Sequence, residues 1–565
     1  MIYGFCRIKR GGRKALIGRI SNILNKDMKL GIRFLVLALS GVLTGLTIAF
    51  PELGFLEWLT IIPAAVILLK RGSDKNVKLR WMYLDGLVFF YGFYLVCYHF
   101  FLSMYPLDFI EGVSDGAAAV VVAVAWFGLS LLQALMGGLV FLLASLIFRG
   151  AVCQRIGFFK PFVASALWAV FEWSQNFGWW GVPWGKLAIG QTKYLAGIQN
   201  ASWFGSYFIT FVIAAVNLLL AYGLLNIEKI KILRISAIVA VSILSFQYIS
   251  GAAIWFTTDI NEGEKVKIAC VQGNISSGNI WTEETVKKLE RVYTEQTYAA
   301  ANAGAKIVLW PETAIPFDLD HSCYTDTDKT YDDMCRDLSN AVEVYLLVGA
   351  YFNDGENSYN SLICYTPDGE RFDTVYNKRR LVPFGEFVPL RGLFEKVIPP
   401  LTEILITFDD IIPGDSPNIM NIDGTNVGNL ICFDSIYDGL TLDSVRDGAE
   451  VICLSTNDAW FMGSAALRIH NSHAQLRAIE SGRYITRCAS TGISTIISPR
   501  GEVLFHIEAD TEGMMIYEVC ERENKTAWYY LGNTFVYICI VFLFAVFTVN
   551  IALKIKKKSK KDLTL

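Results

Sequence analysis

Three short motifs in the second half of the chain carry a carboxylate, an amine and a thiol, each beside a strand-like apolar run. Glu312 follows the run 305–310, Lys378 lies near the start of the stretch 376–386, and Cys432 ends the run 427–432. A thiol attacks a carbonyl only as the thiolate, so it needs a neighbouring base or a lowered pKa. Glu312 could accept the thiol proton, and the amine of Lys378 could stabilise the oxyanion formed on attack. Together the three residues predict nucleophilic chemistry at Cys432.

Each of these residues has a plainer interpretation when it is considered alone. A cysteine after an apolar strand is most often buried and inert, and a lone Glu or Lys is most often solvated. Metal chemistry is not indicated, because the 12 Cys and 5 His include no CxxC pair and no zinc-ligand spacing. We therefore predict neither a metal site nor a cofactor. The nucleophilic interpretation is preferred because its three members occur together.

The segment around the motifs, about 257–528, has the composition of a globular domain in which strands mix with helices. Strand-length apolar runs occur at 265–272, 305–310, 346–350, 361–365, 427–432, 451–455, 495–498 and 514–519. Helical patterns cover 282–303 and 465–482. These elements predict an α/β domain with helices packed on sheets. Cys323 and Cys335 flank a polar stretch of this domain, where they could form a disulfide or remain thiols.

The remainder of the chain is far more apolar, and the whole sequence is 53% hydrophobic with a mean hydropathy of +0.39, as in membrane proteins. Runs near the ~20 residues that cross a bilayer predict eight spans, at about 33–50, 54–69, 82–104, 117–147, 161–175, 203–224, 234–255 and 534–553. The fourth run is overlong, so this span is expected to be tilted or broken near Gly137-Gly138. Asp85 and Glu172 lie in or near spans, either as functional intramembrane charges or at the membrane interface.

Basic residues mark alternate loops, which are expected to be cytoplasmic. They crowd the arm 1–32, the loops before the third, fifth and seventh runs and the tail 554–565, whereas 105–116 has acidic residues and no basic one. The predicted order is a cytoplasmic arm 1–32, a membrane domain 33–255 with seven spans, an extracytoplasmic domain 257–528, an eighth span 534–553 and a cytoplasmic tail 554–565. The positive-inside pattern explains the basic arm better than nucleic-acid binding does, so no nucleic-acid partner is predicted.

Longer motifs around the three residues resemble those of a known group of enzymes. The block that holds Glu312, Lys378 and Cys432 is similar to the carbon–nitrogen hydrolase domain of the nitrilase superfamily, an α-β-β-α sandwich with a Glu-Lys-Cys triad. The whole region 33–553 resembles the apolipoprotein N-acyltransferase family. The motifs that carry this second resemblance are LVPFGEFVP at 381–389, NDAWF at 457–461 and, in the membrane half, GVPW at 181–184 shortly after Glu172.

The resemblance implies two further site residues outside the triad. The family has a second essential glutamate eight residues after its lysine, which corresponds to Glu386 and is expected to orient Lys378 or to tune its charge. A family tryptophan near Trp281 lies in the active site and is expected to contact acyl chains. The alternative for Glu386 is a surface loop position, and the alternative for Trp281 is an aromatic of the core or the membrane interface.

The chain departs from the family pattern directly after the nucleophile. The family order is Cys-Tyr-Glu, whereas this chain has Cys432-Phe433-Asp434, which puts the fine geometry and the acyl or phospholipid preference in doubt. The backbone N–H of Phe433 is expected to be a second oxyanion donor. Three more residues are expected to form a second wall of the active site: Asn457, Asp458 and Trp460. The alternative for them is a structural role in a loop.

The activity implied by the resemblance is N-acyl transfer through a thioester. Cys432 would take an acyl group from a membrane phospholipid and pass it to the α-amine of the diacylglyceryl-cysteine of an apolipoprotein, in ping-pong order. We expect a monomer in the cell membrane, with its catalytic domain on the extracytoplasmic face. One alternative is a membrane-anchored amidase or nitrilase, which uses the same triad but needs only one anchoring span. Another is a lipoprotein-binding scaffold with a relic domain, although a relic would tolerate loss of triad members.

Overall fold

The computed structural model of the chain describes residues 17–19, 21–22, 24, 26–107, 113–274, 282–392, 396, 411–461 and 463–562. These residues form two compact units. The first contains the chain up to Tyr98, the segment Trp126–Ile254 and the chain from Asn533, and the second contains His99–Ala125 and Trp255–Gly532. The second unit thus includes residues 99–125 in addition to the α/β domain expected from the sequence.

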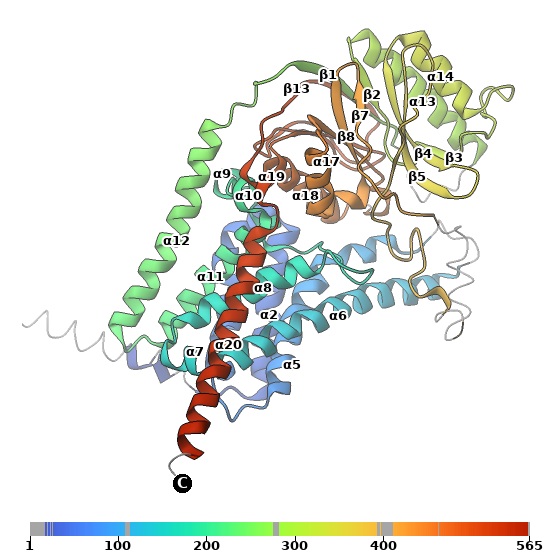
Figure 1. Cartoon of the computed structure of the whole chain (residues 1–565). Coiled ribbons are helices and arrows are strands. Elements are labelled where there is room, and N and C mark those ends of the chain that lie inside the picture. Colours follow the sequence, from blue (N-terminus) through green and yellow to red (C-terminus); the bar gives the residue numbers. More distant parts are fainter. Residues whose placement is uncertain are drawn as a thin grey trace, which may run out of the picture. The chain divides into compact units, whose positions relative to one another are not determined.

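The first unit is helical (Figure 1). Its principal helices are α2 (Leu30–Ala49), α4 (Ile62–Gly72), α5 (Leu79–Cys97), α6 (Asp115–Phe148, which begins in the second unit), α8 (Phe159–Ser174), α11 (Ser206–Leu225), α12 (Ile230–Thr257) and α20 (Thr534–Asp562). Within the described residues, six helical segments are long and apolar enough to cross a membrane: Leu30–Ala49, Pro51–Gly72, Asp115–Phe148, Ser206–Leu225, Ile230–Thr257 and Thr534–Lys557. Helices α5 and α8 occupy the other two predicted spans, so the count of eight spans stays a prediction.

Helix α6 shows why the fourth apolar run contains two adjacent glycines. The helix is continuous over 34 residues and is not broken at Gly137-Gly138. A Cβ atom at Gly137 would overlap the ring of Phe90, and one at Gly138 would lie 2.9 Å from the ring of Tyr83. Both rings belong to α5, so the glycines allow the two helices to approach each other closely.

Two buried carboxylates of the first unit have hydrogen-bond partners within it. The carboxylate of Asp85 accepts from Arg33 Nε at 2.8 Å and from Arg71 Nε at 3.1 Å. Glu172 accepts from the Thr210 hydroxyl at 2.5 Å and from the Leu187 backbone N–H at 3.1 Å. Both carboxylates are almost fully buried. They are therefore internal to the helical unit and do not lie exposed at an interface with water.

The second unit contains two β-sheets. The first has the order β13-β1-β2-β4-β5-β6, with β3 paired to β4, and the second has the order β12-β11-β10-β9-β8-β7. The first sheet consists of β1 (Lys265–Gln272), β2 (Ile307–Leu309), β3 (Ile315–Asp318), β4 (Tyr345–Asn353), β5 (Ser358–Tyr365), β6 (Tyr376–Asn377) and β13 (Gly513–Cys520). The second consists of β7 (Met420–Ile422), β8 (Thr425–Ile431), β9 (Val451–Thr456), β10 (Tyr484–Ala489), β11 (Ser494–Ile497) and β12 (Val503–Ile507).

The two sheets face each other, and each has helices on its outer face. Successive side chains of a strand point to opposite faces. In β1, Ile268 and Cys270 join a core shared with strands of the second sheet, whereas Ala269 and Val271 join a core shared with α13 (Glu283–Asn302) and α14 (Tyr331–Val342). Helices α17 (Asp438–Arg446) and α18 (Ala466–Ser481) pack on the second sheet (Figure 1). This is the α-β-β-α sandwich that the family resemblance implied.

The second unit also contains a pair of buried cysteines and the segment 99–125. Cys323 and Cys335 are both buried free thiols, so the structure contains no disulfide at this position. Residues 99–125 contribute a small apolar cluster of Leu107, Ala118 and Val122, and the ring of Phe100 lies 5.1 Å from that of Phe461. The contact with Phe461 brings this segment next to the motif at 457–461.

Candidate active site

The three predicted residues lie at the carboxyl ends of strands from both sheets. Glu312 follows β2 and Lys378 follows β6 in the first sheet, and Cys432 follows β8 in the second. Parallel neighbours β1 and β2, and likewise β8 and β9, end at the same edge of their sheets. The sandwich therefore collects loops from both sheets at one edge, and the candidate active site is built from these loops.

Lys378 is held between two carboxylates. Its Nζ lies 2.7 Å from Glu312 Oε1 and 2.9 Å from Glu386 Oε1, and the side chain is only 2% exposed. Burial by itself lowers the pKa of Lys378, but the charges of Glu312 and Glu386 outweigh it and hold that pKa well above its usual value. The amine therefore stays charged. Glu386 thus contacts Lys378, and its expected role of orienting the lysine or tuning its charge stays a prediction.

Asn360 of β5 joins the same cluster, and the sequence interpretation missed it. Its Nδ2 donates to Glu312 Oε1 at 2.8 Å and to Glu386 Oε1 at 2.9 Å. Its backbone carbonyl accepts from the N–H of Lys378 at 2.8 Å. One side chain thus fixes the spacing of both carboxylates, and the same residue fixes the backbone of the lysine.

The second oxygen of Glu312 is held from the opposite sheet. Glu312 Oε2 accepts from the backbone N–H of Asn457 at 2.8 Å, and Asn457 Nδ2 donates to Thr313 Oγ1 at 3.0 Å. Asn457 Oδ1 in turn accepts from the Ser490 hydroxyl at 2.7 Å. The predicted wall residue Asn457 therefore contacts Glu312 directly. Glu312 is left with a fixed orientation and two oxygens that already accept hydrogen bonds.

Cys432 is the first residue of a short 3₁₀ turn, Cys432–Ile436, that directly follows β8. Among the described cysteines it is the one that is partly exposed, while the others are buried. Its φ of 48° is in the left-handed region, which non-glycine residues rarely adopt. Burial of the sulfur, and then the nearby charge of Glu312, raise the pKa of the Cys432 thiol well above its usual value, against the opposing effect of Lys378. The resting thiol is therefore neutral and needs a base.

Asp434 connects the turn of Cys432 to the loop of Lys378. Its carboxylate accepts from the backbone N–H groups of Ile431 at 3.1 Å, Arg379 at 3.2 Å and Arg380 at 2.8 Å, and from the Tyr376 hydroxyl at 2.9 Å. Burial raises the pKa of Asp434 from its usual 3.8 to about 6, although these hydrogen bonds and Lys378 oppose the shift. The carboxylate of Asp434, where the resemblance implied Glu, is thus occupied by hydrogen bonds from three backbone N–H groups and one hydroxyl.

The remaining predicted residues have different outcomes. The ring of Phe433 packs edge-on against that of Tyr437, with centroids 5.4 Å apart. Trp460 is half-buried in the 3₁₀ turn Ala459–Phe461, beside the residues that hold Glu312. Trp281 lies outside the described residues, so its predicted contact with acyl chains stays a prediction.

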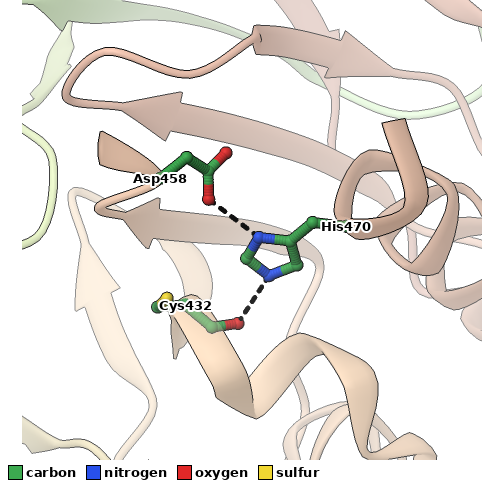
Figure 2. Close-up of side chains that lie close together, drawn as sticks. All are labelled: Cys432, Asp458 and His470. Atoms are coloured by element: carbon green, nitrogen blue, oxygen red, sulfur yellow. Dashed lines mark hydrogen bonds and ion pairs between the residues drawn. The ribbon is translucent and has the colours of Figure 1, made fainter. Parts of the chain in front are cut away.

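A polar cluster lies behind Cys432, as Figure 2 shows. His470 of α18 places Nδ1 2.8 Å from Asp458 Oδ1 and Nε2 3.1 Å from the backbone carbonyl oxygen of Cys432. Arg487 of β10 donates to the other oxygen of Asp458. Burial would raise the pKa of Asp458, but Arg487 and His470 outweigh it and hold that pKa well below its usual value. The sequence singled out Asp458 as a wall residue, but nothing in it pointed to His470 or Arg487.

Ligand atoms of Cys432, Asp458 and His470 lie within 4.8 Å of one another, a spacing that could suit a metal ion. The contacts made by these residues argue against that use. Both oxygens of Asp458 already accept hydrogen bonds, one from the Arg487 cation, and both nitrogens of His470 face oxygen atoms of the protein. A buried arginine at the same carboxylate opposes a second cation. The cluster is better described as a hydrogen-bonded network.

Comparison of the sequence with known proteins identifies its family. The model of the carbon-nitrogen hydrolase family matches residues 267–527, and the model of the apolipoprotein N-acyltransferase N-terminal domain matches residues 40–219. A protein of Methylococcus capsulatus named apolipoprotein N-acyltransferase is 30% identical over 363 residues, which cover 62% of this chain and 67% of that protein. The chain belongs to the apolipoprotein N-acyltransferase family.

Other members of the apolipoprotein N-acyltransferase family align along most of the chain. The protein of that name from Gloeobacter violaceus is 28% identical over 506 residues, covering 89% of this chain and 91% of that protein. The one from Geobacter metallireducens is 27% identical over 517 residues, covering 90% and 93%. Among solved structures, a Nesterenkonia amidase of the nitrilase superfamily covers 47% of this chain and 94% of its own length, with 14% identity and a TM-score of 0.34.

Proposed function

We propose that this chain transfers an acyl group from a membrane phospholipid to the α-amine of the diacylglyceryl-cysteine of an apolipoprotein. The observation that carries the proposal is the charged Lys378 held between Glu312 and Glu386, in the same site as the partly exposed Cys432. The family membership supplies the substrate class, and the geometry supplies the chemistry. We assign Glu312, Lys378 and Cys432 as the catalytic residues.

In the first half-reaction, Cys432 Sγ attacks the ester carbonyl of the phospholipid. Glu312 takes the thiol proton as the C–S bond forms, because the raised pKa of the thiol leaves it protonated at rest. Lys378 and the backbone N–H of Phe433 stabilise the tetrahedral oxyanion. The intermediate collapses with loss of the glycerol oxygen, which takes the proton back from Glu312. The products are a lysophospholipid and an acyl thioester on Cys432.

In the second half-reaction, the α-amine of the acceptor attacks the thioester carbonyl. The same two donors hold the second oxyanion, and Glu312 takes a proton from the attacking nitrogen. The C–S bond then breaks, an amide forms, and Glu312 returns the proton to the sulfur of Cys432. The enzyme is restored without a cofactor, and each half-reaction passes through one oxyanion. Loss of an oxyanion donor should therefore slow both half-reactions.

The helical unit fits substrates that are themselves lipids. Six segments of the described residues are long and apolar enough to cross a membrane, more than a simple anchor requires. Both proposed substrates would reach the site by lateral diffusion, and exclusion of water would protect the thioester from hydrolysis. We propose that the enzyme is a monomer in the cell membrane, with eight spans, a cytoplasmic arm 1–32, the catalytic domain 257–528 outside the cytoplasm and a cytoplasmic tail 554–565. The positions of basic residues support this orientation.

Cysteine labelling tests the orientation. In a Cys432→Ser background, a cysteine is introduced at the exposed position Asp354 or at Ser559, and intact cells are treated with a membrane-impermeant thiol reagent. Asp354→Cys should react and Ser559→Cys should be protected until the cells are permeabilised. The opposite pattern would place the catalytic domain in the cytoplasm.

An assay of transfer tests the function. The full chain in detergent or nanodiscs receives a phospholipid with a labelled acyl chain and a synthetic diacylglyceryl-cysteine peptide, and the peptide is analysed by mass spectrometry. We expect one labelled acyl chain on the α-amine and none with the Cys432→Ser variant. Release of ammonia from amide substrates, with no acylation of the peptide, would instead support the membrane-anchored amidase.

A further inference from the structure

His470 contacts the backbone carbonyl group of Cys432 and not the sulfur atom of that residue. The imidazole is 1% exposed, and Nε2 lies 3.1 Å from the carbonyl oxygen of Cys432 (Figure 2). Nε2 also lies 3.0 Å from Ser435 Oγ. Ser435 Oγ itself donates to the same carbonyl at 2.8 Å. The carbonyl oxygen can only accept, and the Ser435 hydroxyl has already used its hydrogen. Nε2 of His470 must therefore carry a hydrogen and donate toward this turn.

The other side of the imidazole is fixed by the buried pair of Asp458 and Arg487. Nδ1 lies 2.8 Å from Asp458 Oδ1, and Arg487 Nη2 lies 3.2 Å from Nδ1 while it also donates to Asp458. A charged imidazole would donate from Nδ1 to Asp458, and a neutral one would accept there from Arg487. In both states Nε2 is the donor to Cys432, so the contact with the nucleophile does not depend on the charge of the ring.

The carbonyl that His470 holds belongs to a strained residue. Cys432 has a φ of 48°, and such backbone persists only where the surroundings over-determine it. Asp434 accepts from the N–H of Ile431 on one side of Cys432, and His470 and Ser435 donate to its carbonyl on the other. The nucleophile is therefore clamped through its backbone from both directions.

Holding this carbonyl also sets the direction of the next N–H. The peptide unit between Cys432 and Phe433 is planar and trans, so its C=O and N–H bonds point in opposite directions. With the carbonyl directed at His470, the N–H of Phe433 must point away from α18. The N–H of Phe433 is the group that the proposed mechanism uses as the second oxyanion donor.

We propose that His470 is a positioning residue that orients the Cys432–Phe433 peptide and thereby forms the second half of the oxyanion hole. This proposal rests on the proposed acyl transfer and goes beyond the Glu-Lys-Cys triad. Asp458 and Arg487 act through His470, since they hold the ring that holds the peptide. The thiol itself is activated separately, by Glu312 and Lys378.

Two reactions at Cys432 separate this role from a general structural one. Acylation by a p-nitrophenyl acyl ester passes through an oxyanion, whereas alkylation by iodoacetamide forms none. In His470→Ala, we expect the acylation rate to fall by about 100-fold, the effect of losing one oxyanion donor. The alkylation rate should stay within about a factor of three, because alkylation depends on the thiolate alone. His470→Gln, which can still donate an N–H, should lie between His470→Ala and the native chain in acylation.

His473 provides the matched control, since it is a fully buried histidine of the same helix, three residues further along. His473→Gln should leave the ratio of acylation to alkylation unchanged, whatever it does to thermal unfolding. The proposal is overturned if His470→Gln and His470→Ala keep native acylation, or if acylation and alkylation fall together in a folded variant. The p-nitrophenyl ester contains no phospholipid, so an error in the proposed donor would leave this comparison intact.

Discussion

Each unit of the molecule contains a cluster of three charges around a buried central residue, and the signs of the charges in one cluster are opposite to those in the other. In the helical unit, Asp85 lies between Arg33 at 2.8 Å and Arg71 at 3.1 Å. In the sandwich, Lys378 lies between Glu312 at 2.7 Å and Glu386 at 2.9 Å. The central residue of each is nearly inaccessible to solvent. Burial and pairing of charge are therefore alike in both, and they do not by themselves mark a catalytic site.

The two clusters differ in the residues that surround them. Asp85 contacts two arginines of the helical unit. Glu312, in contrast, also accepts a hydrogen bond from the backbone N–H of Asn457. The charges of Glu312 and Lys378 both affect the pKa of the Cys432 thiol. The second cluster thus lies beside a partly exposed thiol, which we propose is the nucleophile, with Glu312 as its base. The comparison predicts that substitutions in the sandwich change rates, whereas substitutions around Asp85 change stability.

Removal of the nucleophile should have the largest effect. Cys432→Ser should reduce transfer by about 10⁵–10⁶-fold, as loss of a nucleophile does in other enzymes of this mechanistic type. The variant should insert in the membrane and unfold at a temperature close to that of the native chain, since Cys432 is partly exposed. Transfer by a well-folded Cys432→Ser or Cys432→Ala variant at the native rate would contradict the assignment.

Removal of the base should come next. Glu312→Gln keeps the size of the side chain but cannot accept the thiol proton, so formation of the acyl-enzyme should slow by about 10²–10⁴-fold. Single-turnover labelling of Cys432 by phospholipid measures this step directly. Glu386→Gln is the matched control, because it removes the other carboxylate that contacts Lys378. An equal effect of both substitutions would mean that the carboxylates only hold the lysine.

Removal of the oxyanion donor should slow both half-reactions. Lys378→Met should reduce acyl-enzyme formation and its aminolysis each by about 10²–10³-fold, because each step forms an oxyanion. Lys378→Arg retains the positive charge between the two glutamates but replaces the compact amine with a planar guanidinium. It should therefore fold better than Lys378→Met, while both half-reactions remain slow. An effect confined to aminolysis would show that Lys378 has a different role.

Asp434 should give a pH dependence of moderate size. Its pKa is raised from 3.8 to about 6, so folding takes up a proton between these values. The stability contributed by the neutral form is fully present below pH 3.8 and is lost as the pH rises through about 6. The activity should change in the opposite direction, since only the ionised carboxylate can accept from the three backbone N–H groups and the Tyr376 hydroxyl at once. Acylation should therefore rise through about pH 6, and Asp434→Asn should remove that step.

Substitution in the other charge cluster should have the smallest effect on rate. Asp85→Asn leaves Arg33 and Arg71 without their counter-charge, so thermal unfolding in detergent should occur at a lower temperature. The acylation rate of the folded fraction should stay within about a factor of two, because rates respond to groups that meet the transition state. A large loss of acylation without loss of stability would mean that the two clusters are coupled.

The sequence revealed the parts of the site that lie in short motifs. Glu312, Lys378 and Cys432 each stand at the end of an apolar run, and Glu386 falls within the distinctive stretch 381–389. Asn360 carried no such signal, since it lies inside β5, where a polar residue suggests only an exposed position. Its contacts with Glu312 and Glu386 join residues 48 and 26 positions apart, which local pattern analysis does not detect.

One strand with a buried charge, β10, was missed for a related physical reason. β10 (Tyr484–Ala489) is buried along its whole length but contains Arg487, which disrupts the apolar pattern. Arg487 is tolerated there because it pairs with Asp458, and Asp458 also holds His470. The sequence predicted the helix that bears His470, yet it offered no reason to connect that helix with Cys432. The network behind the nucleophile could be found only from the fold.

The acyl-enzyme itself is the most direct test of the central claim. The full chain is incubated with a phospholipid that carries a labelled acyl chain, and after removal of lipid the mass of the peptide containing Cys432 is measured before and after addition of a diacylglyceryl-cysteine peptide. The account predicts one labelled acyl group on Cys432, released by hydroxylamine as a thioester, that then moves quantitatively to the α-amine of the acceptor. Transfer of label to the acceptor while Cys432 is never acylated would contradict it.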